Sequence, residues 1–126
     1  MFLMRLLTLT FCLLLTAAVL AEGFTTRVRF QAGTSGAKLQ GAVARGEENT
    51  YILGATGGQT MAVKISSVEG NAVFHIIGSS GKPLAGAEPG KDATQWQGQL
   101  QRDGDYRVVV GATRGGAEYT LQISIK

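Results

Sequence analysis

The chain has 126 residues, a length that fits one domain and leaves no room for two. Its one cysteine, Cys12, and its one histidine, His75, cannot supply the ligands of zinc, haem or iron–sulfur sites, so we predict no metal and no cofactor. The net charge of +3 comes from interspersed basic and acidic residues without a Lys/Arg cluster, and this argues against a nucleic-acid-binding protein.

The N-terminal residues have the pattern of a secretory signal peptide. A basic start ending at Arg5 precedes an apolar run over residues 6–20, and Val19-Leu20-Ala21 has the small residues of a cleavage site. The apolar run has ~15 residues, fewer than the ~20 that a membrane-spanning helix needs. We therefore predict that residues 1–21 are removed and that residues 22–126 form an exported periplasmic domain without a membrane anchor.

Beyond the signal peptide, short segments of alternating apolar and polar residues are separated by glycine-rich turns. In the last segment, for example, Tyr119, Leu121 and Ile123 alternate with polar residues. The 18 glycines and only two prolines suit tight turns between strands, and no helical pattern is present. The expected strands are 25–31, 37–44, 50–55, 59–66, 72–77, 94–101, 105–112 and 117–125.

Eight short strands at this spacing predict an all-β fold, a single antiparallel β-sandwich of the jelly-roll kind. The same alternation places Tyr51 in the core or at its hydrophobic rim. The other residues expected in the core are Val28, Phe30, Met61, Val63, Ile65, Leu121 and Ile123.

Three segments depart from simple alternation. Residues 72–77 form a continuous apolar run, which predicts a strand covered on both faces. Residues 78–92 contain both prolines and no periodicity, so we expect a mobile loop. Trp96 stands between two glutamines and either fills the core or lies on a sugar-stacking face.

The catalytic motifs that the sequence suggests are incomplete. Residues 78–82 lack the first glycine and the Ser/Thr of a phosphate-binding loop. Residues 33–37 end in alanine where a nucleophile elbow requires glycine. Neighbouring acids occur at turns, at 47–48 and 103–105, where they cap and solvate the chain rather than converge in a cleft. We predict that the protein is not an enzyme.

Three stretches of the sequence carry a family resemblance. They are Arg29–Ala37 (RFQAGTSGA) with Gly41, Asn49–Ala55 (NTYILGA) with Gly58-Gln59, and Gly104–Arg114 (GDYRVVVGATR) with the closing YTLQISIK. Taken together, they resemble the bacterial periplasmic inhibitors of g-type (goose-type) lysozyme, in order and spacing over nearly all of residues 22–126. The second and third stretches are also similar to pre-peptidase C-terminal β-sandwich domains.

The resemblance implies a function and a set of binding residues. Such inhibitors place a surface patch and its loops in the peptidoglycan-binding cleft of g-type lysozyme and so protect the cell wall. The resemblance assigns partner binding to Arg114, to its loop neighbours Thr113 and Gly115, and to Tyr51. In one member of the family the loop after Thr-Arg is longer and more basic, with a second arginine, whereas this chain has only Gly115-Gly116 followed by Ala117-Glu118.

A second hypothesis belongs to another class of function. The chain could be a non-inhibitory secreted β-sandwich, a binding or accessory domain for sugar or peptide. An exposed Trp96 on a flat sheet face would favour it, and Arg114 would then be a solvated turn residue.

Overall fold

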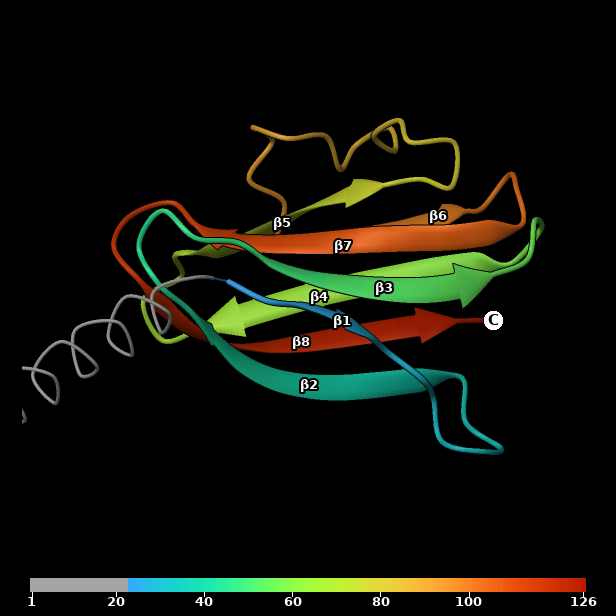
Figure 1. Ribbon diagram of the computed structural model, residues 1–126, viewed down its shortest axis with the longest axis horizontal. Coiled ribbons are helices and arrows are strands. Elements are labelled where there is room, and N and C mark those ends of the chain that lie inside the picture. Colours follow the sequence, from blue (N-terminus) through green and yellow to red (C-terminus); the bar gives the residue numbers. More distant parts are fainter. Residues whose placement is uncertain (1–22) are drawn as a thin grey trace, which may run out of the picture.

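Residues 23–126 form two sheets of four strands each, packed against each other in the computed structural model (Figure 1). The signal peptide predicted at residues 1–21 lies outside these described residues. No helix between residues 23 and 126 is long and apolar enough to cross a membrane. The strands are β1 Thr25–Arg27, β2 Gly36–Val43, β3 Asn49–Ala55, β4 Thr60–Ser67, β5 Ala72–Ile77, β6 Gln95–Gln99, β7 Gly104–Ala112 and β8 Ala117–Ile125.

Successive strands along the chain belong to alternate sheets. The first sheet has the order β1-β3-β7-β5, and the second sheet has the order β2-β8-β4-β6. Every neighbouring pair is antiparallel except β1 and β3, which run parallel. The prediction of an all-β fold with eight strands in a mainly antiparallel sandwich is confirmed.

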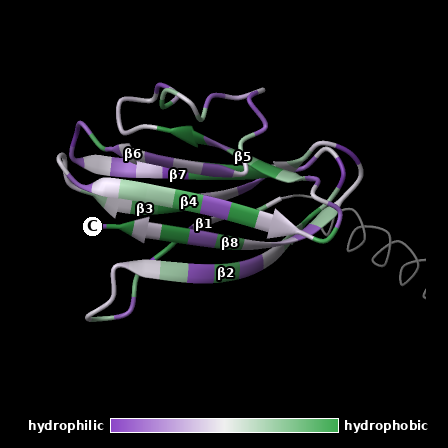
Figure 2. Cartoon of the chain, turned by 180° about the vertical axis from the view of Figure 1, so that it is seen from behind, coloured by the Kyte–Doolittle hydropathy of each residue, from purple (hydrophilic) through white to green (hydrophobic). Residues whose placement is uncertain are grey.

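The core forms because one face of each long strand is apolar. In β4 and β8 buried and more exposed residues alternate, and Figure 2 shows this as successive hydrophobic and hydrophilic bands. Five of the residues predicted for the core are at most 4% exposed, which confirms their placement: Met61, Val63, Ile65, Leu121 and Ile123.

The first strand is shorter than predicted. It ends at Arg27 instead of continuing to residue 31, because the chain then leaves the first sheet and crosses to β2 in the second. The N–H of Val28 still donates to the carbonyl of Ile52 at 2.8 Å. Val28 and Phe30, which the alternation also placed in the core, are half-buried and pack against its margin.

Strand β5 lies at an edge of the first sheet, and residues 78–94 cover that edge. The Phe74 N–H donates to the Ala93 carbonyl at 2.9 Å, and the Ile76 N–H donates to the Ala87 carbonyl at 2.8 Å. These bonds satisfy backbone groups that an edge strand otherwise leaves unpaired. The segment predicted as a mobile loop is therefore tied to β5 along its length. We call residues 78–94 the edge segment.

The expectation that β5 is covered on both faces is corrected by its burial pattern. One side of the strand is in the core, with Phe74 and Ile76 at most 2% exposed. The other side, which carries Val73, His75 and Ile77, is only half-buried. Apolar residues on this half-covered side make the run continuous in sequence although only one face is in the core.

Candidate partner-binding site

Three connections meet at one end of the sandwich, at the left of Figure 1. They join β2 to β3, β4 to β5, and β7 to β8. The last, residues 113–116, carries Arg114, and we call it the Arg114 loop. It contacts both neighbours: the Arg114 Nη2 donates to the Glu69 carbonyl at 3.2 Å, and Gly116 lies so close to Val43 that a Cβ there would be 3.0 Å from the Val43 carbonyl oxygen.

A buried asparagine holds the backbone of the Arg114 loop. Asn71 is 2% exposed, and its side-chain Nδ2 donates to the Arg114 carbonyl at 3.0 Å and to the Gly116 carbonyl at 2.9 Å. Its own backbone carbonyl accepts from the Thr113 N–H at 2.9 Å. Asn71 is therefore hydrogen-bonded to both ends of the loop, and these bonds fix the conformation of the loop backbone.

The predicted loop residues lie on the surface of this end. The structure brings Thr113, Arg114 and Gly115 together, all of them exposed. Gly115 has a φ of 54°, in the left-handed region that glycine adopts without strain, and this allows the tight turn behind Arg114. Arg114 thus projects from a turn whose backbone is fixed, while its guanidinium makes one hydrogen bond within residues 23–126, to the Glu69 carbonyl.

The same end of the sandwich also exposes an apolar side chain. Val68, in the β4–β5 connection next to Glu69, is 99% exposed. A cleft of about 540 Å³ lies at this end, bordered by the β4–β5 connection, the end of β2 and the start of β8, and is lined by Val68, Asn71 and Gly116 among others. This end of the sandwich therefore exposes both a cation and an apolar group, a combination suited to a protein partner.

Tyr51 lies in the interior, as the strand alternation predicts, and not with the Arg114 loop. It is 3% exposed, and its hydroxyl is 2.5 Å from the hydroxyl of Tyr119, which also accepts from Asn49 Nδ2 at 3.0 Å. Burial, and next the hydrogen bond to Tyr119, raise the pKa of Tyr51 far above its ordinary value. The side chain of Tyr51 is therefore not available to a partner in this structure.

The tyrosine pair explains a glycine in β2. A Cβ on Gly41 would lie 2.6 Å from the Tyr119 hydroxyl oxygen and 3.0 Å from that of Tyr51. Gly41 thus makes room for two hydroxyls that are buried and hydrogen-bonded to each other. This group of residues supports the sandwich near the β2–β3 connection, and its role is structural.

Sequence reasoning did not find Asn71. The pair Gly70-Asn71 predicts a turn, and Gly70 indeed has a φ of 65°. Nothing local indicates that the asparagine side chain turns inward to bind a loop more than 40 residues later. Between residues 23 and 126 no group of three or more His, Cys, Asp or Glu residues is placed to hold a metal ion.

Solved structures with the same fold decide the family. Neither a protein-family model nor a curated protein sequence matches the chain. The crystal structure of Aeromonas hydrophila PliG, a periplasmic lysozyme inhibitor of g-type lysozyme, matches with a TM-score of 0.67 and 31% identity, over 84% of this chain and 100% of that one. The chain belongs to the PliG family. Salmonella Typhimurium PliG, described in the same words, matches with a TM-score of 0.65 and 26% identity, over 82% of this chain and 99% of that one.

The fold extends beyond the PliG family. The pre-peptidase C-terminal domain of a Bacillus anthracis collagenase matches with a TM-score of 0.58 and 14% identity, over 81% of this chain and 94% of that one. This likeness concerns the fold alone. The resemblance to both groups that the sequence stretches indicate is therefore confirmed, at the level of family for PliG and of fold for the collagenase domain.

In this PliG-family chain Trp96 is not an open sugar-stacking platform. It is half-buried and packs against the core, and its indole N–H donates to the Ala85 carbonyl at 3.0 Å. The ring lies over Gly98, where a Cβ would be 2.6 Å from the indole, and beside Gly86, where a Cβ would be 3.3 Å away. Of the two predicted positions for Trp96, the structure places it against the core, where it anchors the edge segment to β6.

Proposed function

We propose that this protein is a periplasmic inhibitor of g-type lysozyme and that the Arg114 loop enters the peptidoglycan cleft of the enzyme. The observation that carries the proposal is the 31% identity to A. hydrophila PliG over the whole of that chain. The exposed cation on a loop of fixed backbone supports the assignment of the site.

Arginine suits a cleft where acid chemistry takes place. Glycoside hydrolases cleave with carboxyl groups, and in g-type lysozyme an essential glutamate lies at the base of the cleft. The planar guanidinium of Arg114 bonds a carboxylate through two N–H groups and stays charged at any periplasmic pH. In our proposal Arg114 exchanges its bond to the Glu69 carbonyl for this carboxylate when the partner binds.

The buried asparagine adds to affinity without touching the partner. A loop that is already ordered loses little conformational entropy on binding, and ordering costs otherwise reduce affinity. Asn71 fixes both the Arg114 and the Gly116 carbonyls in the free protein. We propose that this fixation compensates for the short Gly115-Gly116 turn, which offers fewer contacts than a longer loop.

We also propose that the protein is exported to the periplasm through a cleaved signal peptide. The basic start, apolar run and small residues at 19–21 support cleavage after Ala21, and the PliG structures that match are of periplasmic proteins. The expected mature N-terminus is Glu22.

Titration of lysozymes with the purified protein tests the proposal. We expect lysis by a goose-type lysozyme to be inhibited and lysis by a chicken-type lysozyme to be unaffected. Removing one partner of a buried charge pair costs about 2–5 kcal/mol, or roughly 30- to 5,000-fold in Kd, so Arg114→Ala is expected to remove most inhibition. Arg114→Lys is expected to restore only part of it, because the fork is lost.

The matched control is Arg102→Ala, which removes the same side chain from the exposed β6–β7 connection. We expect it to inhibit like the wild type, and both alanine variants to keep the melting temperature. Unchanged inhibition in Arg114→Ala would remove this residue from the site, and a wild type that inhibits no goose-type lysozyme would refute the function itself.

A further inference from the structure

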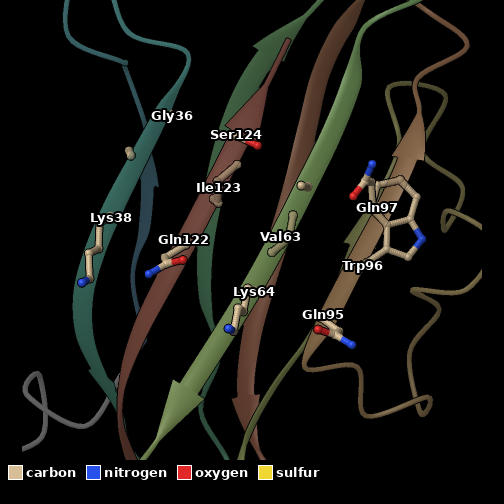
Figure 3. Close-up of a pocket in the computed structure, with 12 residues that line it drawn as sticks. Gly36, Lys38, Val63, Lys64, Gln95, Trp96, Gln97, Gln122, Ile123 and Ser124 are labelled. Atoms are coloured by element: carbon tan, nitrogen blue, oxygen red, sulfur yellow. The ribbon is translucent and has the colours of Figure 1, made fainter.

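A row of polar side chains crosses the outer face of the second sheet. The registers pair Lys38 with Gln122, Gln122 with Lys64, and Lys64 with Gln95, so the row runs over all four strands. All four side chains are exposed, and Figure 3 shows them side by side. Neighbouring strands lie ~4.8 Å apart, so the two lysines stand roughly 10 Å apart on the sheet. We call these four residues the Lys/Gln row.

Beside the Lys/Gln row the sheet surface is hollowed. In the next row along the strands Gly36 pairs with Ser124, and Ser124 pairs with Ala62, so three small residues lie side by side. A groove of about 910 Å³ runs over them, and Gln97 lies at the end of this row on β6. The groove exceeds the cleft of about 540 Å³ at the Arg114 end. The groove forms because the row of three small residues lies next to the long side chains of the Lys/Gln row.

The groove has a positive electrostatic character. Among the residues that the structure describes, no acidic residue lines it. Within residues 23–126 the one ion pair joins Arg27 and Asp105, which lie on the first sheet, so neither groove lysine is neutralised by a carboxylate. The nearest acid along β8 on this face is Glu118, four positions from Gln122 and opposite Ala42. Two ammonium groups are thus free to bind anions.

The side chains of the groove select among anionic ligands. Each glutamine carboxamide both donates and accepts hydrogen bonds, which matches the hydroxyl and acetamido groups of sugars. Trp96 also borders the groove, but its indole is half-buried over Gly98 with its N–H directed to Ala85, whereas the bases of a nucleic acid stack on exposed aromatic rings.

We propose that this groove binds a linear glycan that carries carboxylate groups at intervals. The ammonium groups of Lys38 and Lys64 bind two carboxylates, and Gln122 and Gln95 bond the sugar hydroxyls between and beside them. The small residues Gly36, Ala62 and Ser124 accommodate the sugar rings. The proposal stands independently of lysozyme inhibition, because the Arg114 loop contributes no residue to the groove.

Calorimetric titration with two oligosaccharides of equal length tests the proposal. Hyaluronan oligosaccharide has a carboxylate on every second sugar, and chitin oligosaccharide has none. We expect the protein to bind hyaluronan and not chitin, with an affinity that falls as salt rises. Replacing both lysines, in Lys38→Gln/Lys64→Gln, is expected to weaken binding about tenfold. Ala62→Met, which fills the hollow without a change of charge, is expected to weaken it too.

The matched control is Lys82→Gln/Lys91→Gln, which removes the same charge from the exposed edge segment. We expect it to bind hyaluronan like the wild type, and the Lys38→Gln/Lys64→Gln variant to inhibit lysozyme like the wild type. Equal binding of chitin, no binding of hyaluronan at millimolar concentration, or equal weakening in the control would each overturn the proposal. Tighter binding of polyglutamate or of oligothymidylate would overturn it in favour of a peptide or a nucleic acid.

Discussion

The Arg114 loop and the edge segment are both irregular, and the protein holds them in different ways. The loop is fixed by one buried side chain, Asn71, which donates to two of its carbonyls. The edge segment is fixed by backbone bonds to β5, such as that from Ile76 to Ala87, and by the indole of Trp96. The first arrangement fixes the backbone of the loop and leaves its side chains exposed, whereas the second holds the segment against the sheet edge as a cover.

This difference shows how an irregular segment is suited to its role. A loop that must present a cation needs a fixed backbone and a free side chain, and a buried amide beneath it supplies both. A segment that must protect a sheet edge needs its backbone groups to pair with that edge, as Ala87 and Ala93 do. The variants below separate the two arrangements, in order of decreasing effect.

Trp96→Ala is expected to destabilise the protein most. Loss of a large aromatic side chain from a core costs about 3–5 kcal/mol, and for a half-buried indole we expect about 3 kcal/mol, measured by urea unfolding. Hydrogen exchange should rise along the edge segment, while inhibition by the folded protein stays unchanged. Trp96→Phe keeps most of the ring and loses only the bond to Ala85, at about 1 kcal/mol. Loss of inhibition in folded Trp96→Ala would mean that the two regions are coupled.

Asn71→Ala is expected to have a smaller effect on stability and a larger one on inhibition. Two carbonyls lose their donor, at a cost of about 2 kcal/mol. Because the Arg114 loop then samples more conformations, we expect weaker inhibition with Arg114 still present. A double-mutant cycle with Arg114→Ala measures this coupling. Additive effects on the inhibition constant would show that Asn71 does not act through Arg114.

Tyr51→Phe separates the two roles considered for this tyrosine. The substitution removes a buried hydroxyl bonded to Tyr119, and we expect a loss of about 1 kcal/mol in the free energy of unfolding. Inhibition should be unchanged, because the side chain does not reach the surface. A weaker inhibition constant with unaltered stability would instead return Tyr51 to the binding site.

The smallest effect is expected at the exposed pair of Arg27 and Asp105, which ties β1 to β7 with an Nη2–Oδ2 distance of 2.6 Å. The hydrogen bond from Arg27 lowers the pKa of Asp105 below its ordinary value of 3.8. The stability that this pair contributes is therefore complete above that value and is lost as pH falls through the lower pKa of the folded state. We therefore expect the melting temperature of Asp105→Asn to fall slightly less than that of the wild type as pH is lowered. The control Asp103→Asn should keep the pH-dependent stability that the Arg27–Asp105 pair contributes.

The sequence predicts the sheets well because their cause is local. Alternation in β4 and β8 identifies the buried residues Met61 and Leu121 directly. The same alternation wrongly places Val28 and Phe30 in the core. These residues lie where the chain crosses from one sheet to the other along the margin of the core, and there too apolar and polar residues alternate. The edge segment has no periodicity to detect, since its bonds to β5 are isolated and depend on which strand lies at the edge.

The candidate site is predictable only in part. The family resemblance leads to Arg114, and the structure places it on an exposed loop. The resemblance also leads to Tyr51, which the alternation of Asn49, Tyr51 and Leu53 already places in the interior. The support from Asn71 is a contact between residues far apart in sequence, and it becomes visible only when β5 and β7 are paired.

The position of the indole has a consequence for spectroscopy. Trp96 is the only tryptophan of the chain, and its ring lies between Gly98 of β6 and Gly86 of the edge segment. Its fluorescence therefore reports the attachment of one surface segment, whereas circular dichroism reports both sheets. If the segment detaches before the sheets unfold, the two signals give different midpoints, and the protein carries an internal reporter of local opening without any added label.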